Sequence, residues 1–182
     1  MTDTVSRRRW LYGGVAMVAV GAGLGGAWWR EHQTHSAAGE RMDDAFWSRT
    51  FTRPDGGEVR MADLKGKPML LNFWATWCPP CIEELPMIDR FYKDHASNGW
   101  QVVGLAIDQP TAVRKFLEKL PVTFPVGLAG LEGTDLVKQL GNTAGGLPFT
   151  LVLSADGAIA ARKMGKVEPA DLEAWRRAEV HG

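Results

Sequence analysis

Apolar residues fall into short blocks along the chain, separated by turn residues such as Gly, Pro, Asp and Asn. Blocks rich in Val, Leu, Phe and Trp predict strands, and longer stretches with apolar residues three or four apart predict helices. The predicted strands are 46–51, 58–61, 69–74, 100–107, 124–127, 149–153 and 158–164. The predicted helices are 82–97, 111–119, 134–140 and 169–179. Helices alternate with strands and a hairpin closes the chain, so we expect an α/β fold with a mixed sheet and helices on both faces.

Residues 10–29 form one long apolar segment without a charged residue. Its length suits a single crossing of a bilayer, and the Trp and Tyr residues at its ends are typical of an aromatic belt. Three arginines precede it, which predicts a cytoplasmic N-terminus and places everything after the segment outside the cytoplasm. The predicted order is a cytoplasmic N-terminus at 1–9, a transmembrane anchor at 10–29, a tether at 30–45 and a folded domain at 46–182.

Other interpretations of the apolar segment stay open. A cleaved signal peptide would explain its many glycines, and Ser36-Ala37-Ala38 offers a small-residue cleavage site, although far beyond the apolar run. The stretch from Ser6 to Leu11 also resembles a twin-arginine signal. A buried helix of the fold is a further alternative, which the terminal position and the glycines disfavour. The anchor and the signal peptide both predict that the chain is exported.

The composition narrows the possible functions. The whole chain has a formal net charge of zero, and beyond residue 30 it carries 17 Lys and Arg against 20 Asp and Glu. No basic patch indicates a nucleic-acid partner. The chain has two cysteines, too few for a disulfide-rich scaffold, and both belong to one motif. This use of cysteine favours catalysis.

Cys78 and Cys81 are separated by two residues, where the predicted strand 69–74 gives way to a helix. The free N–H groups and the dipole at a helix N-terminus favour a thiolate. A Cys-x-x-Cys pair in this position can open and close a disulfide with little backbone movement. Cys78 would attack, and Cys81 would resolve the mixed disulfide. The pattern therefore favours redox exchange.

Four other uses of the pair are less consistent with the sequence. A structural disulfide would normally close a longer loop. A zinc site needs about four ligands, and beyond this pair the chain offers only four scattered histidines. Haem attachment requires His after the second Cys, where Ile82 stands. A peroxidatic cysteine would not need Cys81. We expect no metal and no cofactor.

The block from Phe73 to Cys81, followed by Glu84-Leu85-Pro86, resembles the active-site block of TlpA/ResA-like membrane-anchored thioredoxins. The segment 146–150 resembles the cis-proline loop of thioredoxins. The similarity covers about residues 46–180, and the helix and strand within 111–128 match the central insertion of that subfamily. It implies a thioredoxin fold with an N-terminal β-hairpin. It also implies a single-pass anchor in the bacterial inner membrane and a catalytic domain in the periplasm.

The resemblance assigns roles around the cysteine pair. Pro79 and Pro80 restrict the active-site turn. Pro148 should follow a cis peptide bond and face the disulfide, and Leu147 would then present its N–H and C=O to an extended substrate. Trp77 either offers an apolar platform to the partner or packs inside the fold.

Asn72 departs from ordinary cytoplasmic thioredoxins, in which a buried acid at the matching position helps to move the proton of the resolving thiol. An amide cannot do this, and Glu84 is the candidate replacement. Three residues after Cys81, it lies beside that cysteine on one helix face. The alternative is an ordinary solvated glutamate, like its neighbour Glu83.

We therefore predict an extracytoplasmic thiol–disulfide oxidoreductase that reduces specific protein disulfides. The resemblance implies apocytochrome c before haem attachment, or copper-site proteins of an oxidase, as substrates, and a membrane thiol-electron donor as the second partner. The alternatives are a periplasmic disulfide-forming oxidase and a metal-handling (copper) module that uses the same two cysteines.

Overall fold

The computed structural model describes residues 39–180 of the chain. The predicted cytoplasmic N-terminus, the apolar segment 10–29 and most of the tether lie outside the described residues. Within 39–180, no helix is both long enough and apolar enough to cross a bilayer.

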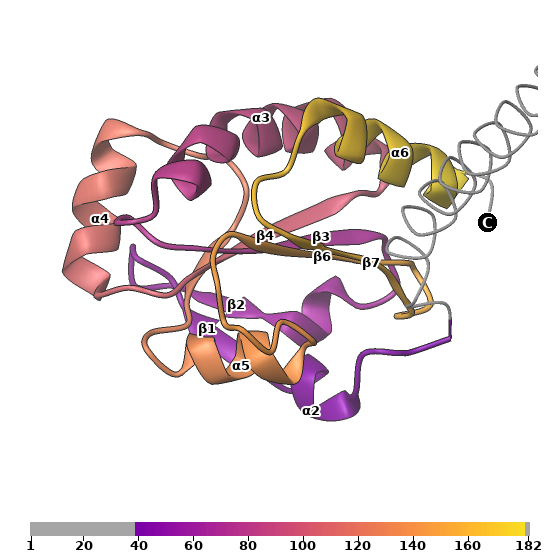
Figure 1. Cartoon of the computed structure of the whole chain (residues 1–182), viewed down its shortest axis with the longest axis horizontal. Helices are drawn as coiled ribbons and strands as arrows, with labels where there is room; N and C mark the ends of the chain where they lie inside the picture. Colours follow the sequence, from indigo (N-terminus) through magenta and orange to yellow (C-terminus); the bar gives the residue numbers. More distant parts are fainter. Residues whose placement is uncertain (1–38, 181–182) are drawn as a thin grey trace, which may run out of the picture. The chain divides into compact units, whose positions relative to one another are not determined.

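A five-stranded sheet forms the centre of the domain (Figure 1). Its strands, in spatial order, are β5 (Val126–Leu128), β4 (Gln101–Ala106), β3 (Met69–Trp74), β6 (Phe149–Leu153) and β7 (Ile159–Met164). Strands β3, β4 and β5 are parallel, whereas β6 and β7 are antiparallel to their neighbours. The predicted mixed sheet is confirmed. Because the parallel strands end at one edge, the loops that follow them gather there.

Helices cover both faces of the sheet, as predicted (Figure 1). On one face, side chains of α3 (Pro79–His95), α4 (Pro110–Lys119) and α6 (Pro169–Val180) pack into one apolar cluster. On the other face, α2 (Asp44–Trp47), α5 (Gly133–Gln139) and the N-terminal hairpin contribute to a second cluster. Short 3₁₀ turns, η1 (Met61–Leu64) and η2 (Ala96–Asn98), complete the described elements. Helix α4 and strand β5 form the predicted central insertion.

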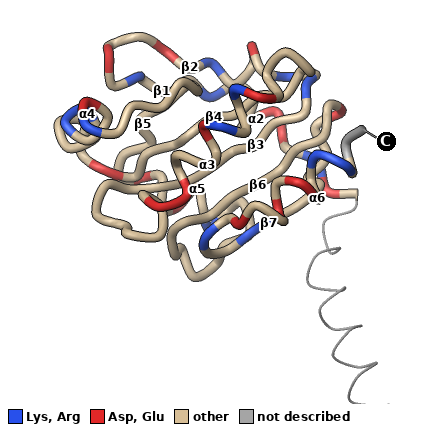
Figure 2. Tube along the Cα trace, turned by 90° about the horizontal axis from the view of Figure 1, so that it is seen from above, with Lys and Arg blue, Asp and Glu red and all other residues tan. Residues whose placement is uncertain are grey.

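The central strand β3 is buried on both faces, as expected for an inner parallel strand. Leu71 and Phe73 point to the cluster beneath α5, while Leu70 and Trp74 point to the cluster beneath α3. Asn72 shares the second face by the two-residue period of a strand, so one polar side chain lies under the active-site helix. Charged residues of both signs are interspersed over the helices and loops of the described domain, and the central strands are uncharged (Figure 2).

The predicted strand 46–51 is only partly correct. Residues 44–47 form the short helix α2, and the strand β1 (Thr50–Thr52) begins later and pairs with β2 (Glu58–Arg60). The side chain of Asp43 accepts a hydrogen bond from the Phe46 N–H at 2.7 Å, so it caps the helix start. This cap turns Phe46 and Trp47 together into the core. Apolar spacing alone did not reveal it.

The domain also begins earlier than the sequence predicted. Residues 40–45 belong to the predicted tether, but Arg41 forms a β-bridge with Ala158 and the Met42 side chain is buried in the core. Glu40 pairs with Arg162 at 2.7 Å. These contacts attach the segment to β7 and to the turn before it.

Candidate active site

The cysteine pair lies at the start of α3, directly after the end of β3. Cys78 is the N-cap residue, and Pro79 and Pro80 occupy the first helical positions, where a missing N–H costs nothing. Cys78 and Cys81 form a disulfide with their Cα atoms 5.3 Å apart. Cys78 is 4% exposed and Cys81 is fully buried. Cys78 is therefore the more exposed cysteine and the one that a partner can reach first.

Several apolar side chains lie at the end of the sheet that carries the cysteine pair. Trp77 precedes the pair and is 65% exposed, so the alternative that it packs inside the fold is wrong. Leu147 is half-buried and packs against the cluster that contains both cysteines. The bond between Leu147 and Pro148 is cis, as predicted. Leu131, in the loop after β5 at the same edge of the sheet, is also exposed.

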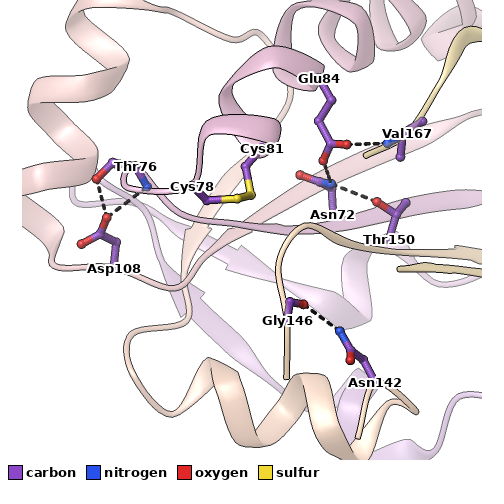
Figure 3. Close-up of a disulfide and its surroundings, with 10 residues drawn as sticks. All are labelled: Asn72, Thr76, Cys78, Cys81, Glu84, Asp108, Asn142, Gly146, Thr150 and Val167. Atoms are coloured by element: carbon purple, nitrogen blue, oxygen red, sulfur yellow. Dashed lines mark hydrogen bonds between the residues drawn. A yellow bond between two sulfur atoms is a disulfide. The ribbon is translucent and has the colours of Figure 1, made fainter. Parts of the chain in front are cut away.

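Two contacts made by hydrogen bonds stabilise the loops around the disulfide (Figure 3). The sequence did not predict either of them. Both the backbone N–H and the hydroxyl of Thr76 donate to one oxygen of Asp108, which follows β4. The buried Asn142 donates from Nδ2 to the Gly146 carbonyl at 2.7 Å. Asp108 could have been suspected, since a polar residue directly after a parallel strand reaches the edge where the cysteines lie. No sequence signal marks Asn142.

Glu84 is fully buried beneath α3, so the alternative of a solvated helix glutamate is wrong. Its Oε1 accepts a hydrogen bond from Asn72 Nδ2 at 2.7 Å, and its Oε2 accepts one from the Val167 N–H at 2.6 Å (Figure 3). The neighbouring Glu83 is the solvent-exposed one and pairs with Lys166 at 2.8 Å. One helical position thus separates a buried carboxyl group from a surface one.

The environment of Glu84 raises its pKa to about 7, because burial disfavours the charged carboxylate. The hydrogen bonds from Val167 and Asn72 oppose this effect without cancelling it. A carboxyl group with such a pKa can take up or release a proton near neutral pH. It lies one helical turn beyond Cys81, on the same face of α3.

Within residues 39–180, the start of α3 carries a disulfide. No group of three or more His, Cys, Asp and Glu side chains in this part of the chain is placed to hold a metal ion. A disulfide at a helix N-terminus can exchange with the thiols or disulfide of another molecule, and the fold around it is that of thioredoxin. The protein is a thiol–disulfide oxidoreductase.

Comparison with known proteins gives the family. The redoxin family pattern matches residues 37–175, so the chain belongs to the redoxin family. It is 30% identical over 122 residues to a thiol-disulfide oxidoreductase ResA of Bacillus cereus, covering 66% of this chain and 68% of the relative. A ResA of Geobacillus kaustophilus is 32% identical over 119 residues, covering 65% and 66%.

Solved structures agree with this assignment. A thiol:disulfide interchange protein of the thioredoxin family from Chlorobium tepidum superposes with a TM-score of 0.65 at 30% identity, covering 73% of this chain and 93% of that one. A thioredoxin-related protein from Neisseria meningitidis serogroup B gives 0.62 at 30% identity, covering 70% and 96%. The predicted family and fold are confirmed.

The buried carboxyl group should make stability depend on pH. The native pKa of Glu84, about 7, lies above the ordinary value of 4.5, so between these values the native state binds more protons than the unfolded state. The free energy of unfolding should therefore fall as pH rises through this range, by up to about 3 kcal/mol. In Glu84→Gln, the free energy of unfolding should change much less with pH over this range. Urea denaturation of the disulfide form from about pH 4.5 to 7.5 measures it.

Glu83→Gln is the matched control, because it removes an exposed carboxyl group one position away. This variant should keep the wild-type slope. Parallel pH profiles for wild type and Glu84→Gln would contradict the assignment of the raised pKa.

Proposed function

We propose that this oxidoreductase reduces specific protein disulfides outside the cytoplasm, tethered to the membrane by residues 10–29. The observation that carries the proposal is a nearly buried disulfide beside exposed apolar side chains. Cys78 is only 4% exposed, whereas the neighbouring Trp77 is 65% exposed. A partner must therefore cover apolar surface to reach the sulfur, which favours a folded or extended polypeptide over a small thiol.

In the reduced protein, the thiolate of Cys78 attacks one sulfur of the substrate disulfide. A new S–S bond forms, and the other substrate sulfur leaves as a thiolate. Cys81 then loses its proton to Glu84 and attacks the Cys78 sulfur. The second substrate sulfur leaves, and Cys78 and Cys81 are joined again. Two electrons have passed from the protein to the substrate, and Glu84 holds the proton until solvent takes it.

Leu147 supports docking of the substrate as an extended strand. Its N–H and C=O take part in no backbone hydrogen bond found within residues 39–180, because β6 begins only at Phe149. Free backbone groups beside a reactive site can pair with an incoming strand. We propose that residues flanking the substrate cysteine pair with Leu147 while an apolar side chain rests on Trp77.

The resemblance to ResA-like proteins suggests apocytochrome c or copper-site proteins as substrates, and a membrane thiol-electron donor that reduces the disulfide again. The topology is testable by fusing a fluorescent protein that matures only in the cytoplasm after Gly182. We expect a dark fusion when residues 1–38 are present and a bright one when they are deleted. A bright full-length fusion would contradict export.

A trapping experiment tests the order of attack. Cys81→Ser leaves Cys78 able to attack and removes the thiol that resolves the mixed disulfide, so the variant should accumulate covalent complexes with its substrates. Non-reducing electrophoresis of membrane extracts shows such complexes, and mass spectrometry identifies the partner. Cys78→Ser is the matched control and should trap far less. Equal trapping by both variants would contradict the assignment of Cys78 as the attacking residue and Cys81 as the resolving one.

The reduction potential should lie near that of thioredoxin. A thiolate at a helix N-terminus is stabilised by N–H donors, and such stabilisation makes a protein oxidising. Pro79 and Pro80 lack N–H groups, so Cys78 is without two donors that other residues would supply. We expect a potential nearer about −270 mV than the about −120 mV of DsbA. Equilibration with glutathione buffers measures it, and a value near −120 mV would favour the oxidase function.

A further inference from the structure

One buried oxygen beneath α3 has no hydrogen-bond partner. The Asn72 side chain is fully buried, and its Oδ1 receives no donor from any residue within 39–180. The other such atom in this range is the Trp74 Nε1. That indole nitrogen faces Gly104, where an added Cβ would lie 3.1 Å from it. The two atoms therefore do not pair with each other. An unpaired buried acceptor is costly, so the lack of a donor at the Asn72 oxygen requires an explanation.

The orientation of the Asn72 amide follows from its two acceptors. Nδ2 donates to Glu84 Oε1 at 2.7 Å and to Thr150 Oγ1 at 3.0 Å. Thr150 is the residue directly opposite Asn72 in the β3–β6 ladder, so the backbone pairing itself holds the hydroxyl in place. Because both N–H groups are used, Oδ1 must face a third direction.

That third direction is the side on which Cys81 lies. Glu84 follows Cys81 by three residues on α3, so the two side chains are neighbours on one helix face. Figure 3 shows the amide oxygen turned away from Glu84 and Thr150 and toward the side of the disulfide. Cys81 is fully buried in the apolar cluster to which Leu70 and Trp74 of β3 also belong. In the disulfide, its sulfur carries no hydrogen and cannot donate.

We propose that Asn72 Oδ1 accepts a hydrogen bond from the Cys81 thiol when the disulfide is reduced. Reduction adds two electrons and two protons: the S–S bond breaks, and each sulfur gains one hydrogen. The S–H of Cys81 then supplies the donor that the oxygen lacks in the oxidised protein. The inference rests on the proposed function, since it concerns the reduced state in which the protein attacks its substrate.

This bond makes Asn72 a positioning residue with two effects. It stabilises the protonated form of Cys81, so Cys81 stays a thiol while Cys78 attacks. It also holds the Cys81 proton on the amide that hydrogen-bonds to Glu84. Glu84 is the residue that receives this proton when Cys81 resolves the mixed disulfide. Because the bond exists only in the reduced state, it shifts the redox equilibrium toward the dithiol.

Infrared spectroscopy of the S–H stretch tests the bond directly. In Cys78→Ser only the Cys81 thiol remains, so one band is expected, at lower frequency than for the same protein in denaturant. Adding Asn72→Leu, which removes the oxygen at similar volume, should move the band to higher frequency. Adding Thr150→Val is the matched control, because it removes a hydroxyl from the same cluster and leaves the oxygen. Its band should stay in place.

Asn72→Asp gives a second test should Asn72→Leu fail to fold. Aspartate keeps an oxygen in the same position and accepts more strongly when ionised, so the band should stay low or move lower. An unchanged frequency in Asn72→Leu, or a frequency in Asn72→Asp equal to that of the denatured chain, would overturn the proposal.

The redox equilibrium supplies an independent readout. In a Glu84→Gln background, where the charge of Glu84 no longer varies, Asn72→Leu should lower the equilibrium constant for reduction by glutathione about fivefold. That change corresponds to a potential about 20 mV more negative. An unchanged constant would contradict the bond. Trapping by Cys81→Ser does not depend on Asn72, so failure of this inference and failure of the proposed function are distinguishable.

Discussion

The site depends on one buried carboxyl group. Glu84 has no contact with solvent, yet both of its oxygens receive N–H donors, from Asn72 in the central strand and from Val167 just before α6. Burying a carboxyl group is unfavourable unless such donors are present. The two bonds therefore join the active-site helix to the sheet and to the C-terminal segment. Because Glu84 lies one turn from Cys81, the contacts that hold these elements together also set the proton affinity beside the reactive pair.

The remaining parts of the site come from the arrangement of parallel strands. Strands β3, β4 and β5 end at one edge, so the cysteine turn, Asp108 and the loop that carries Leu131 gather there. The bond from Thr76 to Asp108 ties two of these loops together. The cis-proline loop arrives from the antiparallel half of the sheet and is held by Asn142. A short motif thus acquires its surroundings from segments far apart in the sequence.

Around this site, polar side chains are buried and an apolar side chain is exposed, the reverse of the usual arrangement in a folded domain. The interior beneath α3 holds a carboxyl, an amide and a hydroxyl group, on Glu84, Asn72 and Thr150, while the surface next to the disulfide carries an exposed Trp77. In the proposed mechanism, the buried carboxyl group of Glu84 takes up a proton away from water, and the exposed indole offers area to a protein partner. This separation fits the proposed exchange of electrons with a bound polypeptide.

The sequence by itself determined the class of the protein, because its decisive signals are local. A Cys-x-x-Cys between an apolar strand and a helix, the Gly-Leu-Pro segment and the order of strands and helices are visible without any contact map. The short helix α2, the packing of residues 40–45 and the links through Asp108 and Asn142 were not visible. The packing of residues 40–45 and the Thr76–Asp108 link depend on partners distant in sequence, and α2 depends on a cap that overrides apolar spacing. The Asn142–Gly146 bond spans only four residues, but no sequence pattern marks it. Glu83 and Glu84 show the limit most clearly. They are adjacent and chemically identical, and only the packing of α3 on β3 decides which one is exposed to solvent and which one is buried with its pKa raised to about 7.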